Sequence, residues 1–168
     1  SNIWGSVSLP DLLSGEKDLF DAHMQLRTNQ PDGPDFLGWL NAPEGVMART
    51  VLAIGSAAQT IASICDTLVV VGSGAACSAA QAALAALGSG EGPEIVFAGT
   101  SLSTAAYVAL CQRLQTREVC LLLASSGSVS MESGIASRAV RWLLERRYGP
   151  EAKQRVFVCA VSGSAMHQ

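Results

Sequence analysis

The sequence predicts an α/β fold in which helices cover both faces of a doubly wound parallel sheet, a three-layer αβα arrangement. Hydrophobic residues make up 49% and charged residues 15% of the 168-residue chain, so most elements should be buried on more than one side. From residue 66 onward, short apolar runs alternate with longer helical patterns, which is the order expected of parallel strands joined by crossover helices. The length suits one domain with a substantial core.

Two regions are distinguished along the chain. Residues 1–45 are mixed and polar, and we expect an N-terminal arm with a short helix over 12–27 followed by a proline-rich loop. The α/β domain is expected over 46–168. It should begin with a helix over 46–64, where apolar and small residues recur at helical spacing.

The regular part of the domain contains four predicted strands and three predicted helices after its first helix. The strands are expected near 67–71, 95–98, 119–123 and 156–160, and the helices over 76–87, 102–114 and 131–148. In the last helix we expect an apolar stripe made of Met131, Ile135, Ala139, Val140, Leu143 and Leu144. Arg141 and Glu145 should form an i,i+4 ion pair on the other side of that helix.

Composition disfavours several classes of protein. A net charge of −3 argues against a general nucleic-acid binder. Residues 67–90 carry no charge, yet alanine, serine and glycine dominate them, so a strand, a turn and a buried helix are expected rather than a membrane span. No signal peptide is recognised, and a cytoplasmic protein is expected. The five cysteines include no CxxC pair, and each lies in an apolar stretch, where a free cysteine behaves as a small hydrophobe: Cys65, Cys77, Cys111, Cys120 and Cys159. A disulfide framework or a metal site is not expected.

A glycine-rich turn follows the first predicted strand. Gly72, Ser73 and Gly74 allow a tight turn, and the next helix offers unpaired N–H groups to an anion. A dinucleotide fingerprint would place a third glycine where Cys77 stands and an acid at the end of the next strand, which ends Ala98-Gly99-Thr100. A nicotinamide site is therefore disfavoured, and no cofactor is expected.

A serine-rich turn follows the third predicted strand. Its hydroxyl groups and the N-terminus of the next helix could hold a phosphate, although each serine could equally be an ordinary helix cap. The candidate binding residues of this turn are Ser125, Ser126, Gly127, Ser128 and Ser130. Because ligands of such folds bind where the strand order reverses, we expect the two turns to face each other there.

These segments resemble glucose-6-phosphate isomerase, in particular its N-terminal sugar-isomerase (SIS) domain. "FLGWLNAPE", "DTLVVVGSGAACSAA", "EIVFAGTSLS" and "SSGSVSMESGIASRAVRWLLERRYGPEAKQRVFV" are similar to consecutive motifs of that family, over roughly residues 35–160. The resemblance implies a sheet of flavodoxin-like order 2-1-3-4, here without the family's fifth strand. It also implies a phosphorylated sugar as ligand and a role in glycolysis and gluconeogenesis.

The departures from the family pattern fall at the phosphate site. Where the family has GIGGS, this chain has Gly72 to Ala76, so the second glycine of the pair and the hydroxyl after it are missing. Alignment on Glu132, which is expected to favour the helix N-terminus, places Val129, Ser130 and Met131 on three family threonines. Alignment on the Ser-Gly pair at 126–127 instead also places residues without a hydroxyl group at positions where the family has one. Binding of a phosphosugar or another small anion is therefore expected to be weak.

The resemblance places the family's catalytic residues after the segment matched here, so we expect no catalytic residue in this chain. His23 and His167, the two histidines, are expected at the surface. The chain is interpreted as the N-terminal SIS half of a glucose-6-phosphate isomerase, either truncated or naturally half-length, and inactive alone. A degenerate anion-sensing module and a structural half that completes an oligomer are the alternatives. The fourth strand lies at an open edge, which we expect to be covered by a neighbouring copy, by the N-terminal arm or by the tail near Met166. A homo-oligomer is expected.

Overall fold

The computed structural model describes residues 9–28, 45–72, 74–88, 90–125, 127 and 129–160. The chain divides into two compact units, Ser1–Leu52 and Ala53–Gln168. In the first unit, α1 (Leu9–Ser14) and α2 (Glu16–Thr28) form the helix predicted over 12–27, which begins earlier and is interrupted at Gly15. No residue of α2 is buried, and His23 is exposed on it as predicted, whereas His167 lies outside the described residues.

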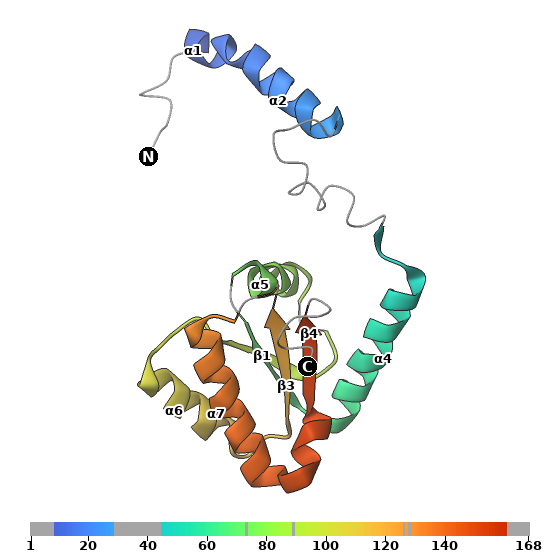
Figure 1. Cartoon of the computed structure of the whole chain (residues 1–168), viewed down its shortest axis with the longest axis vertical. Coiled ribbons are helices and arrows are strands. Elements are labelled where there is room, and N and C mark those ends of the chain that lie inside the picture. Colours follow the sequence, from blue (N-terminus) through green and yellow to red (C-terminus); the bar gives the residue numbers. More distant parts are fainter. Residues whose placement is uncertain are drawn as a thin grey trace. The chain divides into compact units, whose positions relative to one another are not determined.

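The second unit is built on a four-stranded parallel sheet. Its strands are β1 (Thr67–Val71), β2 (Glu94–Ala98), β3 (Val119–Ser125) and β4 (Val156–Ala160), in the order β2-β1-β3-β4. Helix α4 (Ala48–Ile64) leads into β1, and α5 (Ala75–Leu87), α6 (Thr104–Leu114) and α7 (Met131–Tyr148) connect the strands (Figure 1). The 3₁₀ helix η3 (Gly149–Arg155) joins α7 to β4. The predicted α/β class and strand order are confirmed.

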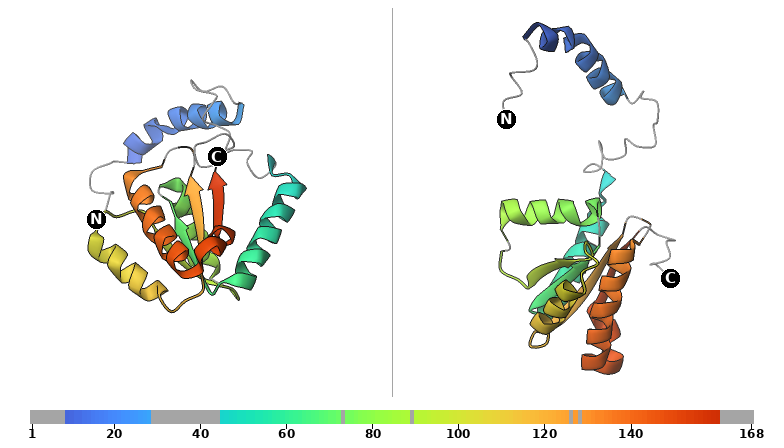
Figure 2. Two further views of the ribbon diagram at one scale, coloured as in Figure 1. Left: turned by 60° about the horizontal axis from the view of Figure 1, so that its bottom comes forward. Right: turned by 90° about the vertical axis from the view of Figure 1, so that its left-hand side faces the viewer.

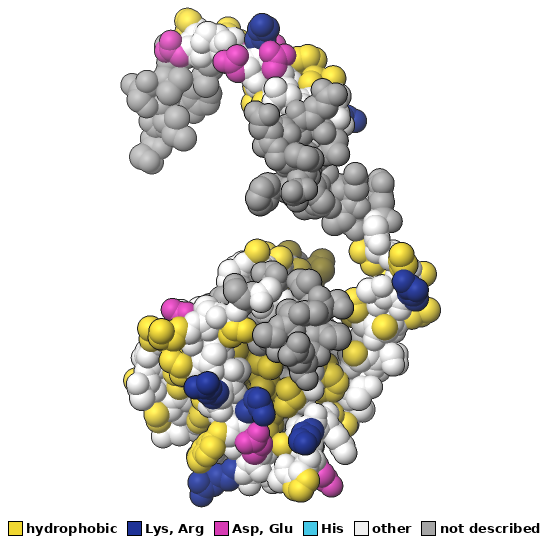
Figure 3. Space-filling model, viewed as in Figure 1, with side chains coloured by type: hydrophobic (Ala, Val, Ile, Leu, Met, Phe, Trp, Pro, Cys, Tyr) yellow, Lys and Arg dark blue, Asp and Glu magenta, His cyan; other side chains and the backbone are white. Residues whose placement is uncertain are grey.

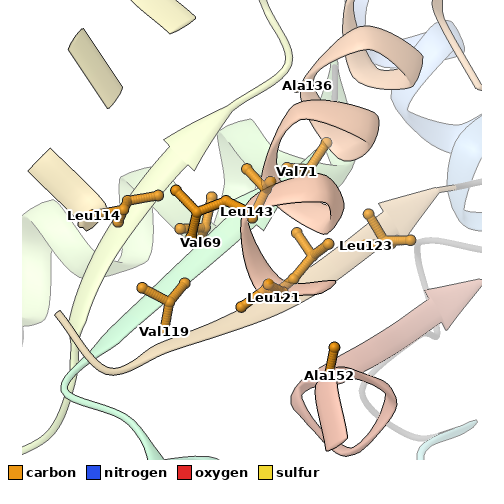
Figure 4. Packing of buried hydrophobic residues seen from close by; sticks show 11 residues of the cluster. Val69, Val71, Leu114, Val119, Leu121, Leu123, Ala136, Leu143 and Ala152 are labelled. Atoms are coloured by element: carbon orange, nitrogen blue, oxygen red, sulfur yellow. The ribbon is translucent and has the colours of Figure 1, made fainter. Parts of the chain in front are cut away.

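Helices cover both faces of the sheet, as the buried strands require. All five residues of β1 are buried, which is typical of a central parallel strand. On one face, side chains of β1 and β3 such as Val69 and Leu121 pack in one cluster with Ala136 and Leu143 of α7 (Figure 4). On the other face, Val70 of β1 belongs to a cluster that includes residues of α4 and α5. Figure 2 shows these layers from two further directions.

The inward face of α7 differs from the predicted stripe. Val140, Leu143 and Leu144 are buried as expected, but Met131 is 70% and Ile135 41% exposed, so including these two was wrong. Ser133 and Ala136 take the inward positions near the start of the helix. Ser133 lies against Gly99 at the end of β2 and donates a hydrogen bond to the Gly99 carbonyl oxygen, which turns this side of the helix inward. The predicted Arg141–Glu145 pair is present at 3.3 Å.

The five cysteines differ in burial. Cys65, Cys77 and Cys120 are buried, and all five thiols are free. Cys111 is half-buried and Cys159 is exposed. Cys159 is exposed because its strand, β4, lies at the edge of the sheet. Among the described helices, none has the length and apolarity to cross a membrane.

An ion-pair network closes the amino-terminal edge of the sheet. Arg117 lies 3.2 Å from Asp66, just before β1, and also contacts Glu94 at the start of β2. Arg147 and Arg155 each lie 3.0 Å from Glu118, just before β3. The partners are partly exposed, so each pair stabilises the fold by no more than about 1 kcal/mol. These arginines are thereby engaged at the edge opposite to the predicted ligand site.

Candidate functional site

The candidate site lies at the carboxyl ends of β1 and β3, where the strand order reverses. The chain leaves β1 toward the edge strand β2 and leaves β3 toward the other edge strand, β4. Val71 and Leu123 are paired in register, so the turns that follow the two strands begin side by side. This is the position at which open α/β sheets bind ligands.

Gly72 brings the two strand ends into close approach. A Cβ atom at this residue would lie 2.6 Å from the Ala124 carbonyl oxygen and 2.8 Å from the Cys77 Sγ, both closer than real Cβ contacts. The Gly72 N–H donates to the Ala98 carbonyl oxygen at 3.2 Å. The glycine after β1 is therefore required by packing among β1, β2, β3 and α5.

A second glycine, Gly99, likewise allows a close approach of backbone and side-chain atoms after β2. Its φ of +100° is one that residues with a side chain rarely adopt. A Cβ atom there would lie 3.1 Å from the Gly72 carbonyl oxygen and 3.1 Å from the Ser133 Oγ. The buried Ser133 hydroxyl donates to the Gly99 carbonyl oxygen at 3.2 Å. This contact brings the first turn of α7 to the ends of β1 and β2, where the Gly72 turn lies.

The N-terminus of α5 points backbone groups at this edge. Gly74 is its N-cap, with φ +58° and ψ −143°, and no described side chain caps the helix. The Gly74 carbonyl oxygen accepts bonds from the Cys77 N–H and from the Ser78 hydroxyl. The first N–H groups of a helix have no partner within it and carry a partial positive charge, which favours an anion.

The serines of the second turn are used locally. The Ser130 hydroxyl accepts the Ser133 N–H at 3.2 Å and so caps α7. The Ser125 hydroxyl accepts the Gly127 N–H at 3.2 Å, and Gly127 has a φ of +142°. The capping role predicted for Ser130 is therefore present.

Three further candidates, Ser73, Ser126 and Ser128, lie outside the described residues. The structure thus brings Gly72, Gly74, Ser125 and Ser130 to one edge of the sheet, while anion binding by these residues stays a prediction.

Charge at this edge gives little support to a phosphate. Glu132 lies in the first turn of α7, where an acid stabilises the helix but opposes a bound anion. Its carbonyl oxygen accepts a hydrogen bond at 3.2 Å from Tyr107 of α6, and burial raises the pKa of that hydroxyl. The attraction for an anion must therefore come mainly from backbone N–H groups.

A large hollow elsewhere is a weaker candidate. It has a volume of about 870 Å³ and is lined by residues of α4, α5 and β2 together with Asp66, Glu94 and Arg117. Its three charged side chains pair with one another. It also lies near the amino ends of the strands, away from the point where ligands of this fold bind. We therefore assign the candidate site to the carboxyl edge.

Sequence reasoning missed Gly99, Ser133 and the N-cap residue of α6. Ser103 accepts the Ala106 N–H at 3.4 Å and starts that helix. A signal for Gly99 was available, since it follows β2 as Gly72 follows β1. Nothing in the sequence indicates that Ser133 is buried. A polar serine near the start of an amphipathic helix is normally expected on the exposed side.

Comparison with known proteins identifies relatives. No protein-family model matches the chain. It is 36% identical over 147 residues to glucose-6-phosphate isomerase of Symbiobacterium thermophilum, covering 81% of this chain and 33% of that protein. It is 35% identical over 141 residues to the same enzyme of Staphylococcus haemolyticus, and 32% identical over 158 residues to that of Streptococcus equi subsp. zooepidemicus. These matches cover 80% and 88% of this chain and 32% and 35% of those enzymes.

A solved structure shares the fold. The crystal structure of a hypothetical protein from Thermus thermophilus superposes with a TM-score of 0.71 and 16% identity, covering 94% of this chain and 37% of that one. The chain spans about a third of the length of the curated relatives that it matches. It is homologous to glucose-6-phosphate isomerase over that third.

Proposed function

We propose that this chain is a sugar-phosphate-binding α/β domain of glucose-6-phosphate isomerase type. The observation that carries the proposal is the convergence of two turns, after β1 and β3, at the edge where the strand order reverses. The backbone N–H groups at the start of α5 supply the attraction for a phosphate. Homology to the isomerases supports a phosphorylated sugar, glucose 6-phosphate or fructose 6-phosphate, over other anions.

The expected affinity is low. The family's hydroxyl positions are occupied by Ala76, Val129 and Met131 in this sequence, and Val129 and Met131 are exposed in the turn and at the start of α7. Replacing one hydroxyl that binds a phosphate removes a charge-assisted bond of about 1.5–3 kcal/mol. A dissociation constant of about 1 mM, near −4 kcal/mol, is expected.

Isomerisation is not proposed for the chain by itself. Proton transfer between adjacent sugar carbons needs a positioned general base. In the family that the chain resembles, the catalytic residues lie beyond the matched third. The role proposed for the chain is therefore to bind the phosphate end of the sugar, in a cytoplasmic protein of central sugar metabolism.

Calorimetric titration with fructose 6-phosphate tests the proposal. The unaltered chain should bind at about millimolar concentration, and Ala76→Ser combined with Val129→Thr should tighten binding at least about tenfold, or about 1.4 kcal/mol. Val108→Thr on α6, also a change of an exposed valine, should have no effect. Micromolar binding by the unaltered chain, or equal tightening by Val108→Thr, contradicts the proposal.

The competing function is that of a structural half that completes an oligomer. One observation favours it: β4 is an edge strand, and its five residues carry no charge. Uncharged edge strands pair readily with another chain. Under this alternative, sedimentation would show an oligomer, and Val158→Lys at an exposed position of β4 would dissociate it. Fructose 6-phosphate would not bind.

A further inference from the structure

Helix α7 carries a second stripe on the side opposite its buried face. Buried α7 residues include Ala136, Val140 and Leu143. At about 100° per residue, a different set points the opposite way and recurs at spacings of four, three, four and four residues. The outer stripe consists of Met131, Ile135, Arg138, Trp142 and Arg146, all exposed.

The outer stripe combines large apolar side chains with two arginines, Arg138 and Arg146, that form no ion pair with any residue the structure describes. Trp142 is 57% exposed, an unusual position for so large an apolar side chain. Arg146 stacks over its ring, with 5.2 Å from the guanidinium carbon to the ring centroid. Arg138 makes no ion pair or hydrogen bond within the described residues. By contrast, the neighbouring Arg141 is paired with Glu145 beside the stripe. Figure 3 shows yellow and dark-blue side chains together over this face of α7.

A hollow next to Trp142 could seat a side chain of a partner. It has a volume of about 550 Å³ and is lined by Gln115 at the end of α6 and by Trp142, Leu143, Arg146 and Arg147 of α7. Apolar residues at a and d spacing are the pattern by which one helix packs along another. Together, the stripe and the hollow form an exposed surface on which one further helix can pack.

We propose that the outer stripe of α7 docks an acidic amphipathic helix of another protein. The partner helix supplies apolar residues against Met131, Ile135 and Trp142 and a carboxylate facing Arg138. Charge selects this occupant, because Arg138 lies at the centre of the stripe between Ile135 and Trp142 and forms no ion pair among the described residues.

A second copy of this chain fits the stripe poorly. The stripe from Met131 to Arg146 is centred between residues 138 and 139, so antiparallel pairing of two copies brings their Arg138 side chains together. Parallel pairing in register does the same. Placing like charges opposite each other at a helix interface opposes association.

The test uses a labelled synthetic peptide and fluorescence anisotropy. The probe is an 18-residue helical peptide with leucines at the a and d positions and one glutamate at the central d position; its matched control carries lysine there. The glutamate peptide should bind the full chain at least about tenfold more tightly than the lysine peptide. Trp142→Ala should weaken the binding of the glutamate peptide about tenfold or more, as expected of a buried aromatic anchor.

A charge reversal separates docking from general electrostatic attraction. Arg138→Glu should invert the preference between the two peptides, whereas Lys153→Glu, an equal charge change at an exposed residue of η3, should leave it unchanged. Circular dichroism verifies that each variant is folded.

Several results overturn the proposal: equal affinity for both peptides, no binding up to millimolar concentration, or an equal effect of Lys153→Glu. It also fails if Trp142→Ala dissociates a dimer in sedimentation, or if anionic phosphatidylserine vesicles bind the protein through Trp142.

Discussion

Substitution of Gly72 by alanine probes the contact that holds the candidate site together. The added Cβ atom would lie 2.6 Å from the Ala124 carbonyl oxygen and 2.8 Å from the Cys77 Sγ. The thiol could move by rotation about its χ1 bond, but the carbonyl oxygen belongs to β3 and is fixed by the sheet. The ends of β1 and β3 must therefore separate by several tenths of an ångström.

Overpacking of this kind costs about 1–3 kcal/mol of unfolding free energy. An alanine also restricts the conformations of the unfolded chain, which raises the unfolding free energy by about 0.4–1 kcal/mol. We expect a net loss of about 0.5–2.5 kcal/mol. With a urea dependence of about 2 kcal/mol per molar, this lowers the midpoint of unfolding by about 0.3–1.2 M.

Urea unfolding followed by circular dichroism measures this shift, and Gly55→Ala is the matched control. Gly55 lies within α4 with nothing within 4 Å of its added Cβ atom, so the same chemical change should stabilise by up to about 1 kcal/mol. Adding Cys77→Ala to Gly72→Ala should not restore stability, since the carbonyl contact remains. The packing account of Gly72 is refuted if Gly72→Ala is as stable as Gly55→Ala.

Three further predictions concern the cap of α7, an ionisable group and the thiols. Ser130→Ala should lower the unfolding free energy by about 1 kcal/mol in thermal unfolding, since the hydroxyl caps α7, while Ser130→Asp should retain most of it. A hydrogen bond from the Thr67 hydroxyl lowers the pKa of Asp66, so the carboxylate stabilises the fold above its unfolded pKa and this contribution disappears as the pH falls through the folded pKa. Asp66→Asn should therefore lower the melting temperature at about pH 6, and its effect should diminish as the pH falls through the folded pKa. Burial raises the pKa of the Cys120 thiol to about 12, so mass spectrometry after brief treatment with an aromatic disulfide should find Cys159 modified and Cys120 intact.

Much of the scaffold could be predicted because its signals are local. Apolar runs bounded by turn residues placed four strands with starts within one residue of those observed, and the predicted helix over 131–148 has the bounds of α7. The third strand extends two residues further than expected, to Ser125, because Ala124 and Ser125 still pair with β4. A small residue followed by serine gives no local signal for such pairing.

The site could be predicted only in outline, since its closure depends on contacts between distant residues. The positions of Gly72 and Ser125 after buried strands indicated the correct edge. That Gly99 adopts a positive φ and meets Ser133, 34 positions further along the chain, follows from the crossing of β2 and α7 and not from either segment alone. The same contact rotates Met131 and Ile135 to the outside of α7, against the predicted stripe.

The most direct test of the account is an amide NMR titration of the chain with fructose 6-phosphate. The account predicts saturable shifts at about millimolar ligand, confined to the amides of Gly72, Gly74 and Gly127 and their neighbours in the two turns. Inorganic phosphate should shift the same amides, because the backbone N–H groups carry the attraction. Shifts centred instead on the hollow beside Asp66 and Arg117, or an absence of shifts at about 20-fold higher ligand, would contradict the assignment of a sugar-phosphate site to this edge.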